Sequence, residues 1–237
     1  MAVDRNKHPG PLRSATMPGL TAPTLKLERR AWKAGEHVVC GMDEVGRGAW
    51  AGPVTVAAVI PGPRHLTGVR DSKQLTRAQR ERVVVGIERW ARAIGVGHAT
   101  HDECDEWGMT AALRAAGRRA LEQLRAQDLE PDRIILDGNH DFLGLGAKVT
   151  TVVKGDATSL AVAAASVVAK VTRDRLMIGE SVNYPGFDFD SNVGYPAPTH
   201  KYALAAYGPT AIHRRSWIFM EHLCWRGVPA PAGRLFA

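Results

Sequence analysis

Two carboxylates stand side by side where an apolar segment ends, and they are the first residues of the chain that could do chemistry. They are Asp43 and Glu44, and Gly46-Arg47-Gly48 follows them at once. A buried carboxylate destabilises a fold by several kcal/mol unless a cation compensates its charge. The rest of the chain must therefore supply a positive partner, or the two acids are surface charges.

Two further acids occupy similar positions. Asp137 ends the apolar segment 133–136, and Asp156 follows the segment 148–155 and precedes an apolar helix. Ligands of open α/β sheets gather at the carboxyl ends of strands, so neighbouring strands would bring all four acids together. Such a cluster repels itself, and a divalent cation relieves the repulsion. Oxygen ligands without His or Cys favour Mg²⁺ or Mn²⁺ over zinc.

Each acid taken alone has a structural alternative. Asp137 precedes a glycine and could be a turn residue, and Asp156 could be a helix N-cap. Asp43 and Glu44 could simply pair with Arg47. The glycines on either side of Arg47 permit close backbone approach to a ligand such as a sugar-phosphate chain. A hairpin turn with a solvent-facing arginine fits the same spacing, so both interpretations stay open.

The elements that must position these residues follow from hydrophobic periodicity and turn signals. Five segments predict strands, the first two joined as a hairpin: 37–43, 53–60, 93–100, 133–138 and 148–156. Six segments predict helices: 24–35, 76–94, 109–127, 157–177, 200–207 and 216–224. The segment 184–198 predicts a polar loop. Strands first, then strands alternating with helices, predict an α/β fold with a mixed central sheet flanked by helices and a helical C-terminal annex.

Two of these helices have informative details. Thr76 and Gln79 form the pattern of a capping box, and apolar residues continue at helical spacing as far as Ile94. The first half of 157–177 is almost entirely small and apolar, which predicts a buried helix. Ser166 within it has no obvious His-Asp arrangement around it. We therefore expect that this serine is present because a small residue lets the helix pack closely on the sheet.

Composition and charge narrow the class of protein. The chain has 237 residues, three cysteines and a formal charge of +7. A basic surplus favours nucleic acid as a partner. No apolar run is long enough to cross a bilayer and no secretory signal is present, so we expect a cytoplasmic protein without membrane association. Nothing requires a dimer, and we expect a monomer.

Domain organisation is expected to be simple. Residues 1–22 predict a disordered tail, 23–226 a single catalytic domain, and 227–237 a flexible C-terminal tail. Between Tyr195 and Ala237 the only acid is Glu221, and cations are interleaved with aromatic residues there. A sugar-phosphate backbone and its bases need that combination. The alternative is that most of these aromatics are core residues, and we expect this of Trp217 and Phe219.

Seven motifs, in this order, resemble ribonuclease HII, the type 2 ribonuclease H, over about residues 24–224. They are GMDEVGRGAWAGPV (41–54), DSKQL (71–75), ILDGN (135–139), VVKGD (152–156), AAASVVAKVTRDR (163–175), GYPAPTH (194–200) and HRRSW (213–217). The resemblance implies that Asp43, Glu44, Asp137 and Asp156 are the active-site acids and hold two Mn²⁺ or Mg²⁺ ions, with Asp43 as the bridge. One ion activates water and the other stabilises the leaving 3′ oxygen, giving 5′-phosphate and 3′-hydroxyl ends.

The resemblance also implies a substrate-binding set. The backbone of Gly46-Arg47-Gly48 would read the ribose 2′-hydroxyl, which distinguishes RNA from DNA. Tyr195 would stack on the sugar at an RNA–DNA junction. Five basic residues would lie along backbone phosphates or support the carboxylates: Lys73, Lys170, Arg173, His213 and Arg214. Asp174 resembles a structural acid near the site, and a helix salt bridge is its expected role.

The predicted activity is hydrolysis of the RNA strand of RNA–DNA hybrids, together with nicking 5′ of single ribonucleotides embedded in duplex DNA. One alternative is an enzyme of the ribonuclease HIII type, which shares the acids but favours longer hybrids. The tyrosine of GYPAPTH and the lack of an N-terminal substrate-binding domain argue against it. A non-catalytic nucleic-acid binder is the other alternative, although no acid of the cluster is missing. Contact between the basic C-terminus and a sliding clamp is left open.

Overall fold

A five-stranded mixed sheet forms the centre of the molecule, as predicted. The computed structural model describes residues 22–70 and 72–222. The strands are β1 (Val39–Val45), β2 (Val54–Ile60), β3 (Ala93–Ala99), β4 (Arg133–Asp137) and β5 (Val149–Val152), in the order β3-β2-β1-β4-β5. β2 pairs antiparallel with both β1 and β3, whereas β4 pairs parallel with both β1 and β5. The predicted tail over residues 1–22, apart from residue 22, and the predicted tail over 227–237 lie outside the described residues.

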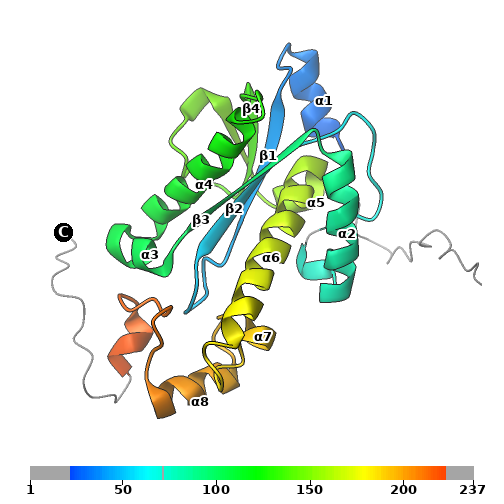
Figure 1. Ribbon diagram of the computed structural model, residues 1–237. Coiled ribbons are helices and arrows are strands. Elements are labelled where there is room, and N and C mark those ends of the chain that lie inside the picture. Colours follow the sequence, from blue (N-terminus) through cyan, green and yellow to red (C-terminus); the bar gives the residue numbers. More distant parts are fainter. Residues whose placement is uncertain (1–21, 71, 223–237) are drawn as a thin grey trace, which may run out of the picture.

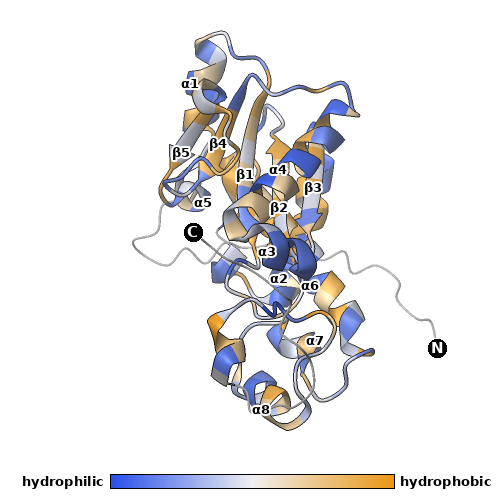
Figure 2. Cartoon of the chain, turned by 90° about the vertical axis from the view of Figure 1, so that its left-hand side faces the viewer, coloured by the Kyte–Doolittle hydropathy of each residue, from blue (hydrophilic) through white to orange (hydrophobic). Residues whose placement is uncertain are grey.

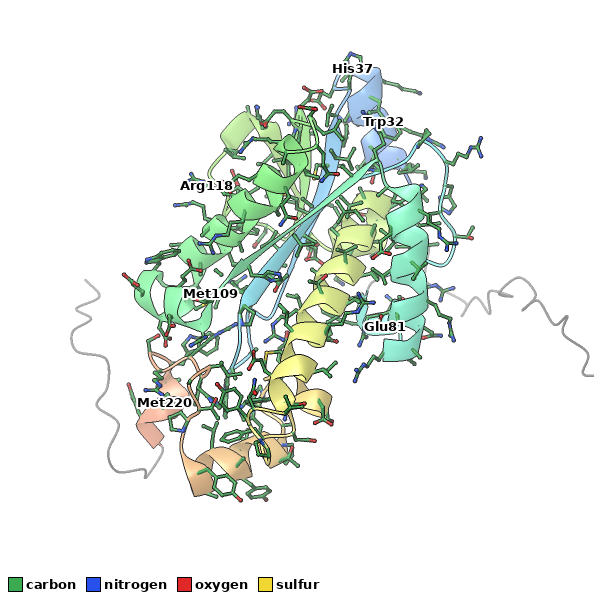
Figure 3. The ribbon with its side chains drawn as sticks, in the orientation of Figure 1. Trp32, His37, Glu81, Met109, Arg118 and Met220 are labelled. Atoms are coloured by element: carbon green, nitrogen blue, oxygen red, sulfur yellow. The ribbon has the colours of Figure 1, made fainter. Side chains whose placement is uncertain are left out.

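Helices cover both faces of this sheet (Figure 1). They are α1 (Lys26–Lys33), α2 (Arg77–Trp90), α3 (His101–Trp107), α4 (Met109–Arg125), α5 (Gly155–Thr158), α6 (Leu160–Ser181), α7 (Phe189–Asn192) and α8 (Pro198–Tyr207), with 3-10 turns η1 (Ser72–Gln74), η2 (Gly146–Lys148) and η3 (Ile218–His222). α4 packs on one face of the sheet, and α6 with α2 covers the other, as Figure 3 shows from the outward positions of Arg118 on α4 and Glu81 on α2. In the part of the chain described here, no helix combines the length and apolar character needed to cross a bilayer.

Strand β2, next to the central strand β1, is buried on both faces. Val56 and Ala58 belong to the apolar cluster under α4, whereas Ala57 and Val59 belong to the cluster under α6. Side chains of a strand alternate between the two faces, so a strand that is covered on both sides reads as a continuous apolar run. The orange central strands in Figure 2 display this composition.

A glycine allows α6 to approach β1 directly. A Cβ atom placed on Gly41 would lie 2.3 Å from the carbonyl carbon of Ala161, which no side chain could tolerate. The small residues at the start of α6 therefore serve backbone-to-sheet packing. This close contact brings the middle of α6, including Ser166, to the level of Asp43.

Several element boundaries differ from the prediction. The capping box at Thr76 is present, but α2 ends at Trp90 and Ile94 belongs to β3. The predicted helix was too long because Ile94, although it lies in β3, packs into the same apolar cluster as α2 and therefore continues the helical spacing. β1 does not end at Asp43 but continues to Val45, and Glu44 is within the strand.

The predicted strand and helix around Asp156 are also corrected. β5 ends at Val152, and Asp156 lies in the one-turn helix α5 instead of at a strand end. The helix predicted over 157–177 is broken at Ser159, whose hydroxyl accepts the amide of Val162 and caps α6. The chain reaches α5 through Lys154 in a left-handed conformation, a turn that periodicity does not reveal.

A helical annex follows α6, as predicted, and it lies at the end of the molecule opposite α1 (Figure 3, Met220 and Trp32). The expected polar loop 184–198 instead contains α7 and contributes Phe187 and Phe189 to the annex core. Phe219 is buried there as expected, whereas Trp217 packs against the same cluster only partly buried. The last predicted helix, 216–224, is the shorter 3-10 turn η3 where it is described.

Candidate active site

Parallel pairing of β1 and β4 places two of the predicted acids side by side. Met42 pairs with Leu136, so Asp43 and Asp137 occupy the next register position on neighbouring strands. Gly41 faces α6, and Asp43, two residues further on, projects to the same face. The two carboxylates therefore meet beneath α6.

Burial and repulsion act together on Asp43. Asp43 is only 7% exposed. Burial raises the pKa of its carboxyl well above the ordinary value, and the charges of Glu44 and Asp137 raise it further. Two hydrogen bonds oppose this shift: one from the Ser166 hydroxyl and one from the amide of Glu44, 2.7 Å from Asp43 Oδ1. Ser166 Oγ also lies 3.0 Å from Ser72 Oγ.

Glu44 is in a similar position. Burial raises the pKa of its carboxyl, and the charge of Asp137 raises it further. Arg47 and Lys73 act in the opposite direction, but Arg47 Nη1 lies 4.0 Å from Glu44 Oε1 and its side chain is 67% exposed. A cation this exposed is strongly screened by water. Local cations therefore compensate the acid cluster only in part.

Asp156, the fourth acid, is connected to Asp137 through Gly155, the residue that precedes it. Asp137 Oδ1 accepts the amide of Gly155 at 2.7 Å, and this bond docks α5 onto the end of β4. Asp156 follows Gly155 directly and is buried at 8% exposure. The structure thus brings Asp43, Glu44 and Asp137 within electrostatic reach of one another, with Asp156 on the helix that Asp137 binds.

The donor set has the chemistry of a site for a hard divalent cation. All the acids offer oxygen ligands, and burial followed by mutual repulsion raises the pKa of Asp43 and Glu44, a repulsion that such an ion would relieve. Among residues 22–70 and 72–222, however, no three His, Cys, Asp or Glu side chains already stand in an arrangement that could hold a metal ion. Ion binding would therefore require small rearrangements of these carboxylates.

A cavity of about 380 Å³ opens beside the acids. Its lining combines two of the acids, the glycine turn and basic residues: Asp43, Glu44, Val45, Gly46, Arg47, Gly48, Ser72, Lys73, Ser166, Lys170 and Tyr195. The amide of Gly46 donates to the hydroxyl of Tyr195 at 3.1 Å, which joins the turn to the annex. Six of the nine predicted substrate-binding residues line this cavity: the three of the glycine turn, Lys73, Lys170 and Tyr195. The other three, Arg173, His213 and Arg214, do not.

Lys170 and Asp174 form an ion pair one turn apart on α6. Lys170 Nζ lies 2.8 Å from Asp174 Oδ1 and 5.5 Å from the centre of the Tyr195 ring. Arg80 approaches the same carboxylate at 3.4 Å. The helix salt bridge expected for Asp174 is therefore confirmed, and Lys170 is held beside the tyrosine.

Arg173 does not face the cavity, which corrects its expected place along phosphates. It is fully buried, and its guanidinium donates to the carbonyls of Ala51, Pro53 and Val193 at 3.0, 2.8 and 2.9 Å. Burial lowers the pKa of this arginine to about 10. Its stem closes the space behind Gly46, where a Cβ atom would lie 2.2 Å from Arg173 Nε.

Arg214 is also a structural cation instead of a phosphate ligand. It is fully buried and donates to the carbonyl of Gly52 at 3.0 Å and to that of Arg47 at 3.0 Å. Burial lowers the pKa of its guanidinium. Together, the two buried arginines fix the loop that carries the glycine turn.

His213 belongs to a buried histidine pair and cannot reach a phosphate. Nδ1 of His200 lies 2.8 Å from the carbonyl of Tyr195, which only accepts, so this nitrogen carries the proton. His213 Nδ1 accepts the amide of Thr210 at 2.9 Å, and its Nε2 then donates to His200 Nε2 at 2.8 Å. Burial, followed by the neighbouring positive charges, lowers the pKa of His213 to about 3. The neutral pair supports the backbone at Tyr195.

Two residues of the site were missed by sequence reasoning. Ser166 was interpreted only as a small packing residue, but its hydroxyl binds Asp43. Ser72, in the DSK motif, lines the cavity beside it. A polar residue in an otherwise apolar half-helix was the signal that could have identified Ser166, because a buried hydroxyl needs a partner.

Comparisons with known proteins agree with this geometry. A family model described as Ribonuclease HII matches residues 40–220. The Ribonuclease HII of Streptomyces avermitilis is 50% identical over 208 residues, covering 86% of this chain and 88% of that protein. The ribonuclease H2 structure from Pyrococcus horikoshii OT3 superimposes with a TM-score of 0.63 at 29% identity, covering 78% of this chain and 95% of that one. The structure of the PCNA:RNase HII complex from Archaeoglobus fulgidus has a TM-score of 0.63 at 24% identity, over 80% of this chain and 98% of the matched one.

These matches extend across the sheet, α6 and the annex. The predicted ribonuclease H-like fold is therefore confirmed, as is the resemblance drawn from the seven motifs. The chain belongs to the ribonuclease HII family, the metal-dependent endoribonucleases that act on RNA–DNA hybrids.

Proposed function

We propose that Asp43, Glu44, Asp137 and Asp156 hold two divalent cations, Mn²⁺ or Mg²⁺, and that the chain uses them to cut RNA in hybrids and to nick 5′ of single ribonucleotides in DNA. The observation that supports this most strongly is the adjacency of Asp43 and Asp137 on parallel strands, where burial and then mutual repulsion raise the pKa of the Asp43 carboxyl. Divalent ions at such a site supply the charge that activates water and stabilises a leaving 3′ oxygen.

Asp43 is the candidate bridging ligand. It interacts electrostatically with both Glu44 and Asp137, and Ser166 holds its carboxylate from the α6 side. A buried hydroxyl that donates to a carboxylate orients it and favours its charged form, which is the form that binds cations. The chain's own contribution is therefore to keep Asp43 oriented at the centre of the cluster.

The glycine turn and Tyr195 are the candidate readers of the ribonucleotide. The turn exposes its backbone to the cavity, and the Gly46 amide already donates to the Tyr195 hydroxyl. A 2′-hydroxyl both donates and accepts, so backbone groups at this position can distinguish ribose from deoxyribose. Lys73 and Lys170, which line the same cavity, are the candidates for phosphate contact.

The test is cleavage of a labelled duplex with one ribonucleotide, beside a long RNA–DNA hybrid. We expect Mn²⁺ or Mg²⁺ to support a nick 5′ of the ribonucleotide, and chelator to stop it. An enzyme of the ribonuclease HIII type would cut the long hybrid but not the single-ribonucleotide duplex. A non-catalytic binder would retain both duplexes without cutting either, and an Asp137→Asn change would then alter nothing.

A sliding clamp is the protein partner that we propose for this chain. The ribonuclease HII of Archaeoglobus fulgidus has been solved in complex with PCNA, and the basic character of residues 195–237 leaves the same contact open for this chain. We expect the full chain to bind the clamp of its own organism in calorimetry. Binding to neither the free clamp nor the clamp on DNA would remove this partner.

A further inference from the structure

A buried glutamate joins the first helix to the start of α6. Glu28 on α1 is fully buried, and its Oε1 accepts the hydroxyl of Ser159 at 2.6 Å and the amide of Ala161 at 2.9 Å. Its Oε2 has no hydrogen-bond partner among the described residues. A half-satisfied buried carboxyl is destabilising, so a fold that keeps one at this place requires an explanation.

Helix capping explains only part of this arrangement. Negative charge at the start of a long helix is favourable, and α6 runs from Leu160 to Ser181. The Ser159 hydroxyl, however, already accepts the amide of Val162 and caps the helix without any acid. What Glu28 adds is a connection between α1 and the residue at which α5 ends and α6 begins.

Backbone bonds extend that connection around the same junction. The amide of Thr24 donates to the carbonyl of Thr158 at 3.1 Å, and the amide of Leu160 donates to the carbonyl of Thr24 at 3.0 Å. Thr158 and Leu160, on either side of Ser159, are therefore held by the segment just before α1. Glu28 binds Ser159 and Ala161, so the junction is bound from two points on the N-terminal segment.

The short helix α5 depends on such external support. It has four residues, begins after Lys154 in a left-handed conformation, and carries Asp156 in its first turn. One turn of helix is not stable by itself, so its position is set by what holds its ends. The Gly155 amide bound to Asp137 fixes one end, and the Glu28 junction fixes the other.

We propose that Glu28 is a positioning residue for Asp156: it fixes the junction between α5 and α6 and thereby sets the carboxylate of Asp156 relative to Asp137. This inference depends on the proposed metal role of Asp156. Groups that orient metal ligands typically change metal affinity by about 10–100-fold when they are removed. Glu28 would act at a longer range, through the backbone of four residues.

The test measures Mn²⁺ affinity of the full chain by calorimetry, without substrate. We expect Glu28→Leu to weaken Mn²⁺ binding by about tenfold, because both accepted bonds are lost. Glu28→Gln should retain near-normal affinity, since its amide oxygen can accept the same two bonds. Ser159→Ala removes one of them together with the Val162 cap of α6, and its Mn²⁺ affinity should fall between those of the two Glu28 variants. Hydrogen exchange of residues 155–162 should speed up in the same order.

Kinetics and a matched core variant separate positioning from general stability. Leu124→Ala creates a cavity on the opposite face of the sheet, and it should lower the melting temperature while leaving Mn²⁺ affinity unchanged. With Glu28→Leu, we expect the Mn²⁺ concentration for half-maximal cleavage to rise about tenfold while KM for the hybrid stays constant.

Mn²⁺ binding by Asp156→Asn and Glu28→Leu distinguishes failure of this inference from failure of the proposed function. Weaker Mn²⁺ binding in Asp156→Asn together with unchanged binding in Glu28→Leu would overturn the role of Glu28 alone. Unchanged binding in Asp156→Asn would overturn the metal role of Asp156 and this inference with it. If Glu28→Leu and Leu124→Ala lost equal amounts of Mn²⁺ affinity, Glu28 would contribute only to the general stability of the fold.

Discussion

The molecule contains two charged interiors that are built in opposite ways. At the acid cluster, the carboxylates of Asp43, Glu44 and Asp137 repel one another, and burial raises the pKa of the first two. Behind the glycine turn, the guanidiniums of Arg173 and Arg214 are fully buried, yet backbone carbonyls accept their hydrogen bonds. The buried arginines, whose partners are neutral carbonyls, therefore support the structure, whereas the cluster of like charges is suited to a ligand of opposite charge.

The largest effect is expected when Asp43, the central acid of the cluster, is replaced. Asp43→Asn should lower cleavage by more than about 100-fold, since even groups that only orient metal ligands cost up to that much. The same change should raise the free energy of unfolding by about 1 kcal/mol in metal-free buffer, because it removes a buried, repelled carboxylate. Single-turnover cleavage and urea unfolding measure the two effects.

A matched substitution controls for the chemical change itself. Asp102→Asn makes the same replacement at a side chain that is 82% exposed, and neither activity nor stability should change noticeably. Loss of stability in Asp43→Asn would contradict the view that this carboxylate is held against repulsion.

Removal of a buried arginine should instead lower the free energy of unfolding. Arg173→Met leaves the carbonyls of Ala51, Pro53 and Val193 without their donor, and we expect unfolding to become easier by about 3 kcal/mol. Arg175→Met is the control on the same helix, because that side chain is 55% exposed and should lose less than about 1 kcal/mol. A similar small loss in both variants would show that the Arg173 bonds do not hold the loops.

The two parts of the molecule should also respond to pH in opposite directions. Burial lowers the pKa of His213 to about 3, so from there to about 6.5 the unfolded chain binds more protons and stability rises with pH. The raised pKa values of Asp43 and Glu44 mean that above about pH 4 the folded chain binds more protons, so this contribution falls as pH rises. Urea unfolding from pH 4 to 6.5 should show a more positive slope in Asp43→Asn, by at most about 1.4 kcal/mol per pH unit.

Two outcomes of that series would contradict the comparison. An unchanged slope in Asp43→Asn would mean that this carboxyl ionises as easily in the fold as in the unfolded chain. A slope in His213→Asn that is no less positive than that of the parent chain would mean that the buried histidine contributes little.

The smallest expected effect is at the serine that binds Asp43. Ser166→Ala removes a hydrogen bond that favours the charged carboxylate, so the pKa of Asp43 should rise further. We expect cleavage at neutral pH to fall about fivefold, corresponding to about 1 kcal/mol, and the acid limb of the pH profile to move upward. Ser181→Ala, at the far end of the same helix, should leave the profile in place. A fivefold loss without any shift of the profile would indicate a packing effect.

Local signals predicted most of the fold. The capping box at Thr76 and the apolar strands around Asp43 and Asp137 depend on neighbouring residues, and these elements are confirmed. The left-handed turn at Lys154 has no such signal, so the helix carrying Asp156 was mistaken for a strand end. Turn conformations of this kind depend on contacts made elsewhere in the chain.

The site was predicted unevenly for the same reason. Acids at or near the ends of strands, such as Asp43 and Asp137, can be read along the sequence, because strand direction determines where they meet. The burial of Arg173 and Arg214 could not, because cations are usually exposed, and here the carbonyls of loops around residues 47–53 and of Val193 accept their hydrogen bonds. Glu28 was overlooked because its partners lie more than a hundred residues away.

The most direct test of the central claim is a crystal structure with Mn²⁺, examined by anomalous scattering. We expect two ions, with Asp43 between them and the carboxylates of Glu44, Asp137 and Asp156 moved inward as ligands. Ions bound elsewhere, or a site from which Asp137 or Asp156 is absent, would contradict the claim that these acids form one metal-binding cluster.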